Sequence, residues 1–178
     1  AASDVYKRQL MAFKLFSQQQ PDICIFEVGL GGRLDATNVC LPTATIITSI
    51  DYDHQEFLGH TLPDITAEKS GIIKPNIPIF TTDNQHYSAM KIIKQKAKDA
   101  KAPLTIVKPL SGKHELGLNG IHQYINAALA KQCIETCFPK ITSEQIKQGL
   151  KETSHWGRLS VVQHLSLIHI SEPTRPFH

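Results

Sequence analysis

The sequence has 178 residues, of which 41% are hydrophobic and 20% are charged, as in an ordinary globular chain with its own core. The net charge of +3 is too small to indicate a nucleic-acid or membrane-surface partner. No apolar stretch approaches the ~18 residues that a bilayer-crossing helix needs, which argues against a transmembrane protein. The 4 cysteines form no C-x-x-C pair, so neither a zinc knuckle nor a disulfide framework is indicated, and a reducing cytoplasm is the expected location.

Both ends of the sequence resemble translated sequencing adapters. Residues 1–9 match one transposase adapter residue for residue, and residues 165–178 match its partner and the tail that follows it. We therefore expect the protein itself to lie within residues 10–164, cut from a longer gene at both sides, and we exclude the two ends from fold reasoning.

The interior predicts helices and strands in alternation. An apolar stripe ended by Pro21 predicts the first helix, over residues 10–19. A capping box at Thr61 predicts a helix that stops at Gly71. Apolar or β-branched runs predict strands over residues 23–28, 43–50, 77–81 and 104–107. Further helices are expected over residues 87–100, 121–137 and 143–151. This alternation predicts an α/β fold with a mostly parallel sheet and flanking helices.

Neither common phosphate-binding motif fits the glycine-rich segment 29–32. A dinucleotide fingerprint that starts at Gly29 would put Leu34 where close packing requires glycine or alanine, and the residues after it read as loop. The one Gly-Lys pair is followed by His114, so the sequence contains no Walker A lysine.

Three polar groups are candidates for chemistry, each with a plain alternative. Glu27 ends an apolar run, where it either faces solvent or holds a hard cation at the carboxyl end of a strand. Residues 51–54, which end in His54, follow the next strand and form either a metal or phosphate site or an ordinary polar loop. Lys69 lies one helical turn from Ile65 and Ile73, so its amine is either desolvated on the apolar face or snorkels at a helix end. The residues alone favour the snorkelling lysine.

Two further groups favour structural roles. The polar residues 122–126 begin a predicted helix, where such residues usually serve as caps. Cys133 and Cys137 are four residues apart on that helix, and without another soft ligand they are expected to belong to the core.

The block Phe26–Asn38 (FEVGLGGRLDATN) closely resembles the folylpolyglutamate synthase / dihydrofolate synthase family of the Mur ligase superfamily. Further blocks agree in the expected order, over residues 49–59, 67–75, 119–128 and 156–158. The resemblance spans nearly all of residues 10–164. It implies a partial Mur-ligase-type central ATPase domain over residues 10–155, whose P-loop region is missing, and the start of the C-terminal domain over residues 156–164.

The resemblance also implies a reaction. In this family ATP phosphorylates the carboxylate of dihydropteroate or of a folate polyglutamate, and the amine of L-glutamate attacks the acyl phosphate, which yields an amide, ADP and phosphate. By this resemblance Leu34, Asp35 and Ala36 match positions that contact the pterin-bearing substrate, and Asn126 and Arg158 match nucleotide contacts. Residues 10–164 by themselves are expected to be inactive and not to bind ATP with useful affinity.

The same resemblance gives the polar candidates catalytic roles. It implies that Glu27 and His54 bind Mg²⁺ and that Lys69 is carried as a carbamate. Magnesium would offset the repulsion between ATP and the carboxylate substrate. A carbamate replaces a cationic amine, which divalent ions would repel, with an anionic partner.

Two other functions remain as alternatives. Another Mur-type amino-acid ligase of cell-wall synthesis would share the aspartate–histidine loop and the modified lysine, but it would lack the Gly-Leu-Gly-Gly-Arg-Leu-Asp-Ala-Thr-Asn loop. A non-catalytic α/β binding module would have no need for Glu27, His54 and Lys69 together. We expect a cytoplasmic enzyme, monomeric at full length, without a nucleic-acid or membrane partner.

Overall fold

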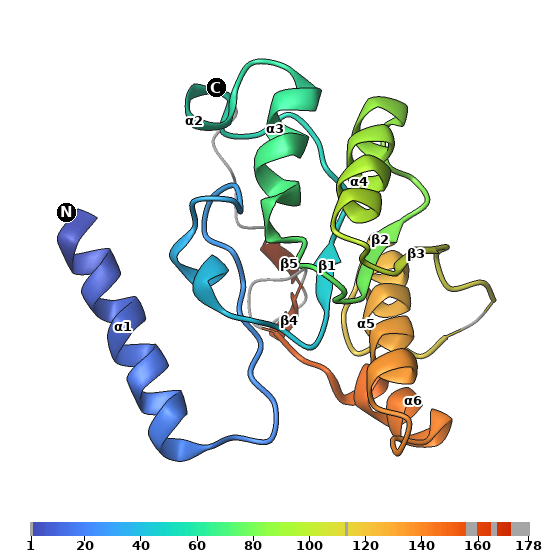
Figure 1. Ribbon diagram of the computed structural model, residues 1–178. Coiled ribbons are helices and arrows are strands. Elements are labelled where there is room, and N and C mark those ends of the chain that lie inside the picture. Colours follow the sequence, from blue (N-terminus) through green and yellow to red (C-terminus); the bar gives the residue numbers. More distant parts are fainter. Residues whose placement is uncertain (1, 113, 156–159, 165–166, 172–178) are drawn as a thin grey trace. The chain divides into compact units, whose positions relative to one another are not determined.

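The computed structural model describes residues 2–112, 114–155, 160–164 and 167–171 (Figure 1). Its α-helices are α1 (Ala2–Gln19), α2 (Gln55–Leu58), α3 (Leu62–Lys69), α4 (Tyr87–Asp99), α5 (Gln123–Cys137) and α6 (Ser143–Glu152). Its 3-10 helices are η1 (Ala36–Val39) and η2 (Ser70–Ile72). Its strands are β1 (Thr45–Ile47), β2 (Ile79–Thr82), β3 (Leu104–Val107), β4 (Ser160–His164) and β5 (Leu167–Ser171).

The predicted α/β architecture is confirmed. Strands β1, β2 and β3 form a parallel sheet in the order β1-β2-β3, and helices follow β1 and β2 along the chain. Three of the four predicted strands are present within a few residues of their expected bounds, as are the predicted helices apart from the start of the first. Strands β4 and β5 were not predicted. They pair antiparallel, with Ser160 opposite Ser171 and His164 opposite Leu167.

The chain forms two compact units. One comprises Ala1–Ile79 and Gln85–Leu104, and the other Phe80–Asn84 and Thr105–His178. No helix among the described residues is both long and apolar enough to cross a membrane.

Helices α3 and α4 lie side by side in the first unit (Figure 1). Thr61 and Asp64 form the predicted capping box at the start of α3, which fixes the direction in which that helix leaves the loop. The residues that form the core of this unit are buried: Ile47, Ile50, Leu58, Leu62, Ile65, Ile79, Ala89, Ile93, Ala97 and Ala102. In α4 the buried positions recur every four residues, so its lysines lie on the other faces.

In the second unit, α5 and α6 pack against each other. Helix α5 buries Ile125, Ala128 and Leu129, and α6 buries Ile146. The loop before α5 is attached to the end of α6, because Gly117 N–H donates to the carbonyl of Leu150 at 2.9 Å.

The prediction of a strand over residues 23–28 is wrong. This segment is irregular in the structure, and Ile25 is 90% exposed. A strand forms only where a neighbouring strand supplies hydrogen bonds, and none of the described strands pairs with this run. The apolar side chain of Phe26 instead packs on α1, with ring centroids 5.3 Å from Phe13 and 5.9 Å from Phe16. The apolar run suggested that Glu27 ends a strand, but in the structure it does not.

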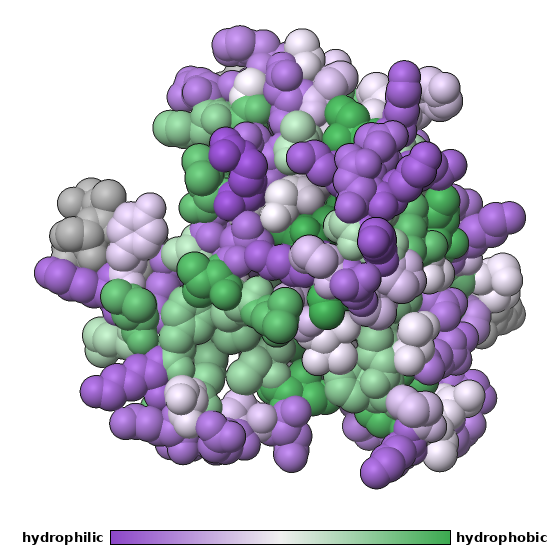
Figure 2. Space-filling model, in the orientation of Figure 1, coloured by the Kyte–Doolittle hydropathy of each residue, from purple (hydrophilic) through white to green (hydrophobic). Residues whose placement is uncertain are grey.

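Helix α1 is longer than predicted, because it begins at Ala2, inside the adapter-like residues 1–9. Much of its apolar surface is exposed, and Figure 2 shows hydrophobic side chains at the surface along this helix and beside it. The exposed apolar residues of α1 include Leu10, Met11 and Leu15.

Candidate functional site

The segment from Gly29 to Cys40, here called the glycine loop, is closed on itself by Asp35. The Oδ2 atom of Asp35 accepts from the backbone N–H of Gly29 at 3.0 Å and of Leu30 at 3.2 Å. Its Oδ1 atom accepts from the N–H of Thr37 at 2.9 Å and from the Thr37 hydroxyl at 2.5 Å. Both carboxylate oxygens are therefore occupied by the loop itself.

These hydrogen bonds also lower the pKa of Asp35. Burial by itself would raise the pKa of this carboxyl group, but the hydrogen bonds from Thr37, Leu30 and Gly29 outweigh burial and lower the pKa. As the N-cap of η1, Asp35 turns residues 36–39, which the sequence suggested were plain loop, into a 3-10 helix.

The glycine loop lies directly on the end of α3. The N–H of Arg33 donates to the carbonyl of Glu68 at 2.9 Å. A Cβ atom on Gly32 would lie 2.8 Å from the carbonyl oxygen of Lys69 and 2.9 Å from that of Glu68, so the two backbones meet where glycine has no side chain. The contact brings the two sequence motifs that contain Gly32 and Lys69 together.

Asn38 extends this contact from the far end of the loop. Its Nδ2 atom donates to the carbonyl of Arg33 at 3.0 Å and to that of Gly71 at 3.2 Å. The ammonium group of Lys74 donates to the carbonyl of Asn38 at 2.6 Å. Residues on both sides of Lys69 are thus bonded to the glycine loop.

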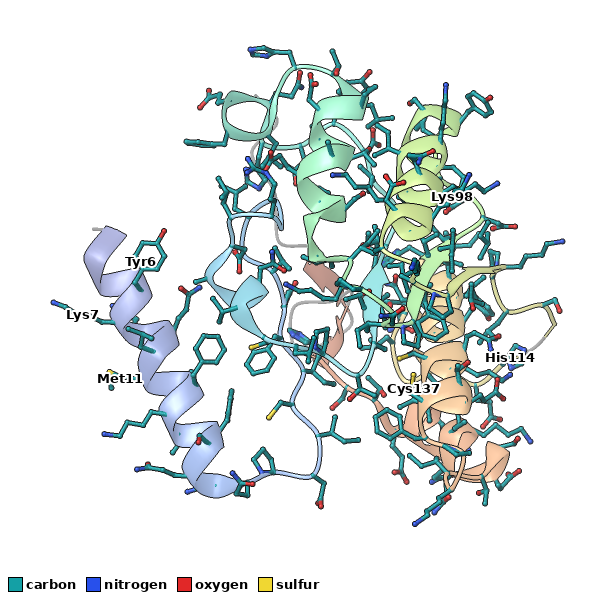
Figure 3. The ribbon with its side chains drawn as sticks, viewed as in Figure 1. Tyr6, Lys7, Met11, Lys98, His114 and Cys137 are labelled. Atoms are coloured by element: carbon teal, nitrogen blue, oxygen red, sulfur yellow. The ribbon has the colours of Figure 1, made fainter. Side chains whose placement is uncertain are left out.

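A pocket of about 370 Å³ lies at this junction, within the first unit. It is lined by Leu30, Gly31, Gly32, Leu34, Asp35, Ala36, Phe57, Leu58 and Glu68, and by Tyr6 and Gln9 of the adapter-like residues 1–9. The volume is within the range of small-molecule sites, and most of the lining side chains are apolar. In Figure 3, Tyr6 extends from α1 toward the rest of the unit, and Lys7 and Met11 lie on the opposite side of that helix.

Leu34, Asp35 and Ala36, which follow one another in the chain, all line this pocket. Sequence reasoning assigned no role to Arg33 or Glu68, although both lie inside the motifs that carried the resemblance. Their opposite charges were the available signal, but only the fold shows that residues 35 positions apart meet.

Lys69 is the last residue of α3 and is half-buried. The apolar face predicted for it is present, since Ile65 is fully buried one turn earlier and Ile73 packs against the core. The next residue, Ser70, is also buried, and its hydroxyl has no hydrogen-bond partner among the described residues.

The two predicted metal ligands are accessible but do not belong to a preformed cluster. Glu27 is exposed in the irregular segment before the glycine loop. His54 caps α2 with a positive φ of 50°, and its Nε2 atom lies 3.6 Å from Oδ2 of Asp53. Across the residues that the structure describes, no three or more histidine, cysteine, aspartate or glutamate side chains are grouped to hold a metal ion.

Of the two predicted nucleotide contacts, Asn126 belongs to the second unit. Asn126 lies on the first turn of α5, where its Nδ2 atom donates to Oε1 of Gln123 at 3.2 Å. Gln123 is in turn bonded to His122, with Nε2 atoms 3.0 Å apart. Arg158 lies outside the described residues, as does the rest of the 156–158 motif.

Comparison with known proteins identifies relatives over most of this chain. No protein-family model matches the sequence. A folylpolyglutamate synthase of Arabidopsis thaliana is 46% identical over 171 residues, which cover 86% of this chain and 30% of that protein. The dihydrofolate synthase/folylpolyglutamate synthase of Bacillus subtilis is 37% identical over 180 residues, which cover 85% of this chain and 42% of that protein.

The fold has close matches among solved structures as well. An FPGS–AMPPCP–folate complex superimposes with a TM-score of 0.81 and 28% identity, over 89% of this chain and 45% of that one. The chain thus spans less than half the length of these relatives and of this structure.

Proposed function

We propose that this chain, which belongs to the folylpolyglutamate synthase / dihydrofolate synthase family, provides the folate-side pocket of an ATP-dependent ligase that joins L-glutamate to dihydropteroate or to folate polyglutamates. The solved relative that holds AMPPCP and folate supports both substrate classes. The cytoplasmic location and the monomeric state expected for the full-length protein are part of the same proposal.

The observation that carries the proposal is the pocket at the glycine loop. Leu34, Asp35 and Ala36, which the family resemblance assigned to the pterin-bearing substrate, line one cavity together with the apolar side chains of Leu30 and Phe57. A flat heteroaromatic ring suits walls of this kind. The pocket also reaches Glu68, the neighbour of the proposed carbamate lysine in α3.

The structure supports a different role for Asp35 from that of a direct ligand. Its two oxygens already accept four hydrogen bonds from Gly29, Leu30 and Thr37. We therefore propose that Asp35 shapes the loop, and that side chains such as Leu34 and the loop backbone make the contacts with the substrate.

Glu27 and His54 are proposed to hold Mg²⁺. The donor set fits a hard cation in part, because the Glu27 carboxylate offers exposed oxygens, and His54 is accessible beside the carboxylate of Asp53. When bound, the ion would offset the charge of the ATP phosphates and of the substrate carboxylate. Lys69, as a carbamate, would add a negative group on the half-buried end of α3.

Two measurements test the proposed function. In the full-length product of the gene, ADP release from ATP should require both L-glutamate and either dihydropteroate or a folate. In the chain described here, dihydropteroate binding is measured by titration calorimetry. The Leu34→Glu variant should weaken binding at least about tenfold, because it places a charge in an apolar wall.

Leu41→Glu is the matched control, since Leu41 is an equally exposed leucine of the same unit that does not line the pocket (81% exposed, against 74% for Leu34). Equal effects of the two substitutions, or ADP release that needs a cell-wall precursor in place of a folate, would contradict the proposal.

A further inference from the structure

The glycine loop and the end of α3 are joined by a side-chain pair as well as by their backbones. Nε and Nη2 of Arg33 donate to Oε1 of Glu68 at 3.0 and 2.9 Å. The backbone N–H of Arg33 donates to the carbonyl of the same residue at 2.9 Å. Arg33 thus donates three hydrogen bonds to Glu68, and these bonds link segments 35 residues apart.

This pair joins a residue of the glycine loop to the residue that precedes Lys69. Glu68 lines the pocket, and Lys69 follows it in the last turn of α3. Arg33 is flanked in the glycine loop by Gly32 and Leu34, which also line the pocket. The Arg33–Glu68 pair therefore adds a side-chain link, beside the backbone contacts, between the glycine loop and the residue next to Lys69.

We propose that Arg33 and Glu68 are positioning residues: their pair transmits occupancy of the pocket to the turn that carries Lys69, and this coupling rests on the folate-side function proposed above. Residues 66–74 are here called the α3 turn. With the pair formed, a bound pterin-type ligand restrains the α3 turn and holds Lys69 at a fixed distance from the pocket. With the pair broken, only the backbone contacts and the hydrogen bonds of Asn38 join the two segments, and the ligand restrains the α3 turn less than the glycine loop.

The pair suits this role better than that of a stabilising ion pair. The side chain of Arg33 is 54% exposed and that of Glu68 26%, so solvent screens their attraction. The fork of the guanidinium group nonetheless sets an orientation that a single ammonium group cannot. Loss of the pair should therefore change the coupled motion of the two segments far more than the fold.

Amide hydrogen exchange of this chain, with and without 7,8-dihydropteroate, tests the proposal. In the wild-type chain the ligand should slow exchange in both the glycine loop and the α3 turn. In Arg33→Met, which keeps an apolar stem but no donor, slowing should persist in the glycine loop and fall by up to about fivefold in the α3 turn, as expected for loss of one exposed pair. Arg33→Lys should keep part of the coupling.

The matched control is Glu135→Gln, which breaks the Lys131–Glu135 pair of α5, also 2.9 Å long, and should leave exchange in both segments unchanged. Coupling of wild-type strength in Arg33→Met would overturn the proposal. If dihydropteroate slows no exchange in the wild-type chain, the proposed function fails. The ligand-free chains then decide the role of the pair: faster exchange of the α3 turn in Arg33→Met supports it, and unchanged exchange refutes it.

Discussion

A Cβ atom on Gly71 would lie 2.5 Å from the Cα atom and 2.9 Å from the backbone nitrogen of Arg33, so only glycine fits at this point between the α3 turn and the glycine loop. The sequence suggested that Gly71 stops the helix. In the structure it lies within η2, and close approach to Arg33 is what requires glycine there.

Gly71→Ala should therefore displace the glycine loop. The added methyl group meets backbone atoms, which cannot rotate away, so we expect a loss of about 1–3 kcal/mol in the free energy of unfolding. Gly149→Ala is the control, because nothing lies within 4 Å of its Cβ position in α6, and it should raise stability by about 0.5–1 kcal/mol. Urea unfolding measures both. Similar changes in the free energy of unfolding for the two substitutions would show that the glycine loop does not pack against Gly71.

The hydrogen bonds to Asp35 predict a pH-dependent stability. Folding lowers the pKa of this carboxyl group. The ionised carboxylate therefore adds to the free energy of unfolding in full above the ordinary pKa of 3.8, and this stabilisation is lost as the pH falls through the lowered pKa. Asp35→Asn removes this titration. The wild-type chain should be more stable than the variant at neutral pH, and the difference should shrink as the pH falls below about 4. Urea midpoints across this range test the prediction, and a difference independent of pH would contradict it.

Substitutions of Lys69 in the full-length enzyme test the carbamate hypothesis. Lys69→Ala should lose most activity, and acetate should partly restore it by supplying a carboxylate in the vacated space. Lys69→Arg should not respond to acetate, because a guanidinium group cannot be carbamylated and keeps its positive charge. Turnover is measured for both variants over an acetate series, with the wild-type enzyme as the control. Normal turnover of Lys69→Arg would return Lys69 to the role of an ordinary helix-end lysine.

The cysteines predict an order of chemical labelling. Burial, together with the neighbouring Cys137, raises the pKa of Cys133 to about 11, so only about one molecule in a thousand carries the reactive thiolate at pH 8. Cys24 is exposed and should react first with iodoacetamide, and Cys133 last. Peptide mass spectrometry over time measures the order. Early labelling of Cys133 would mean that α5 opens readily in solution.

The elements that depend on local sequence were predicted well. The capping box at Thr61, the β-branched run before residue 50 and the lysine-bearing helix of residues 87–100 all have their expected structures, because capping, strand propensity and helical periodicity act over a few residues. The strand prediction for residues 23–28 was wrong because it depended on a distant partner strand. An apolar segment becomes a strand only beside a partner, and local sequence does not specify that partner.

The sequence by itself determined the fold class, the family and three of the residues that line the pocket (Leu34, Asp35 and Ala36), since these are carried by periodicity and by contiguous motifs. Only the tertiary structure decided how those residues are used. It directs both oxygens of Asp35 into its own loop, joins Arg33 to Glu68, and places Gly32 against the backbone of Lys69. The contacts of Arg33 and Gly32 join segments about 35 residues apart, and their geometry follows from the packing of the loop on α3, not from the residues on either side of each one.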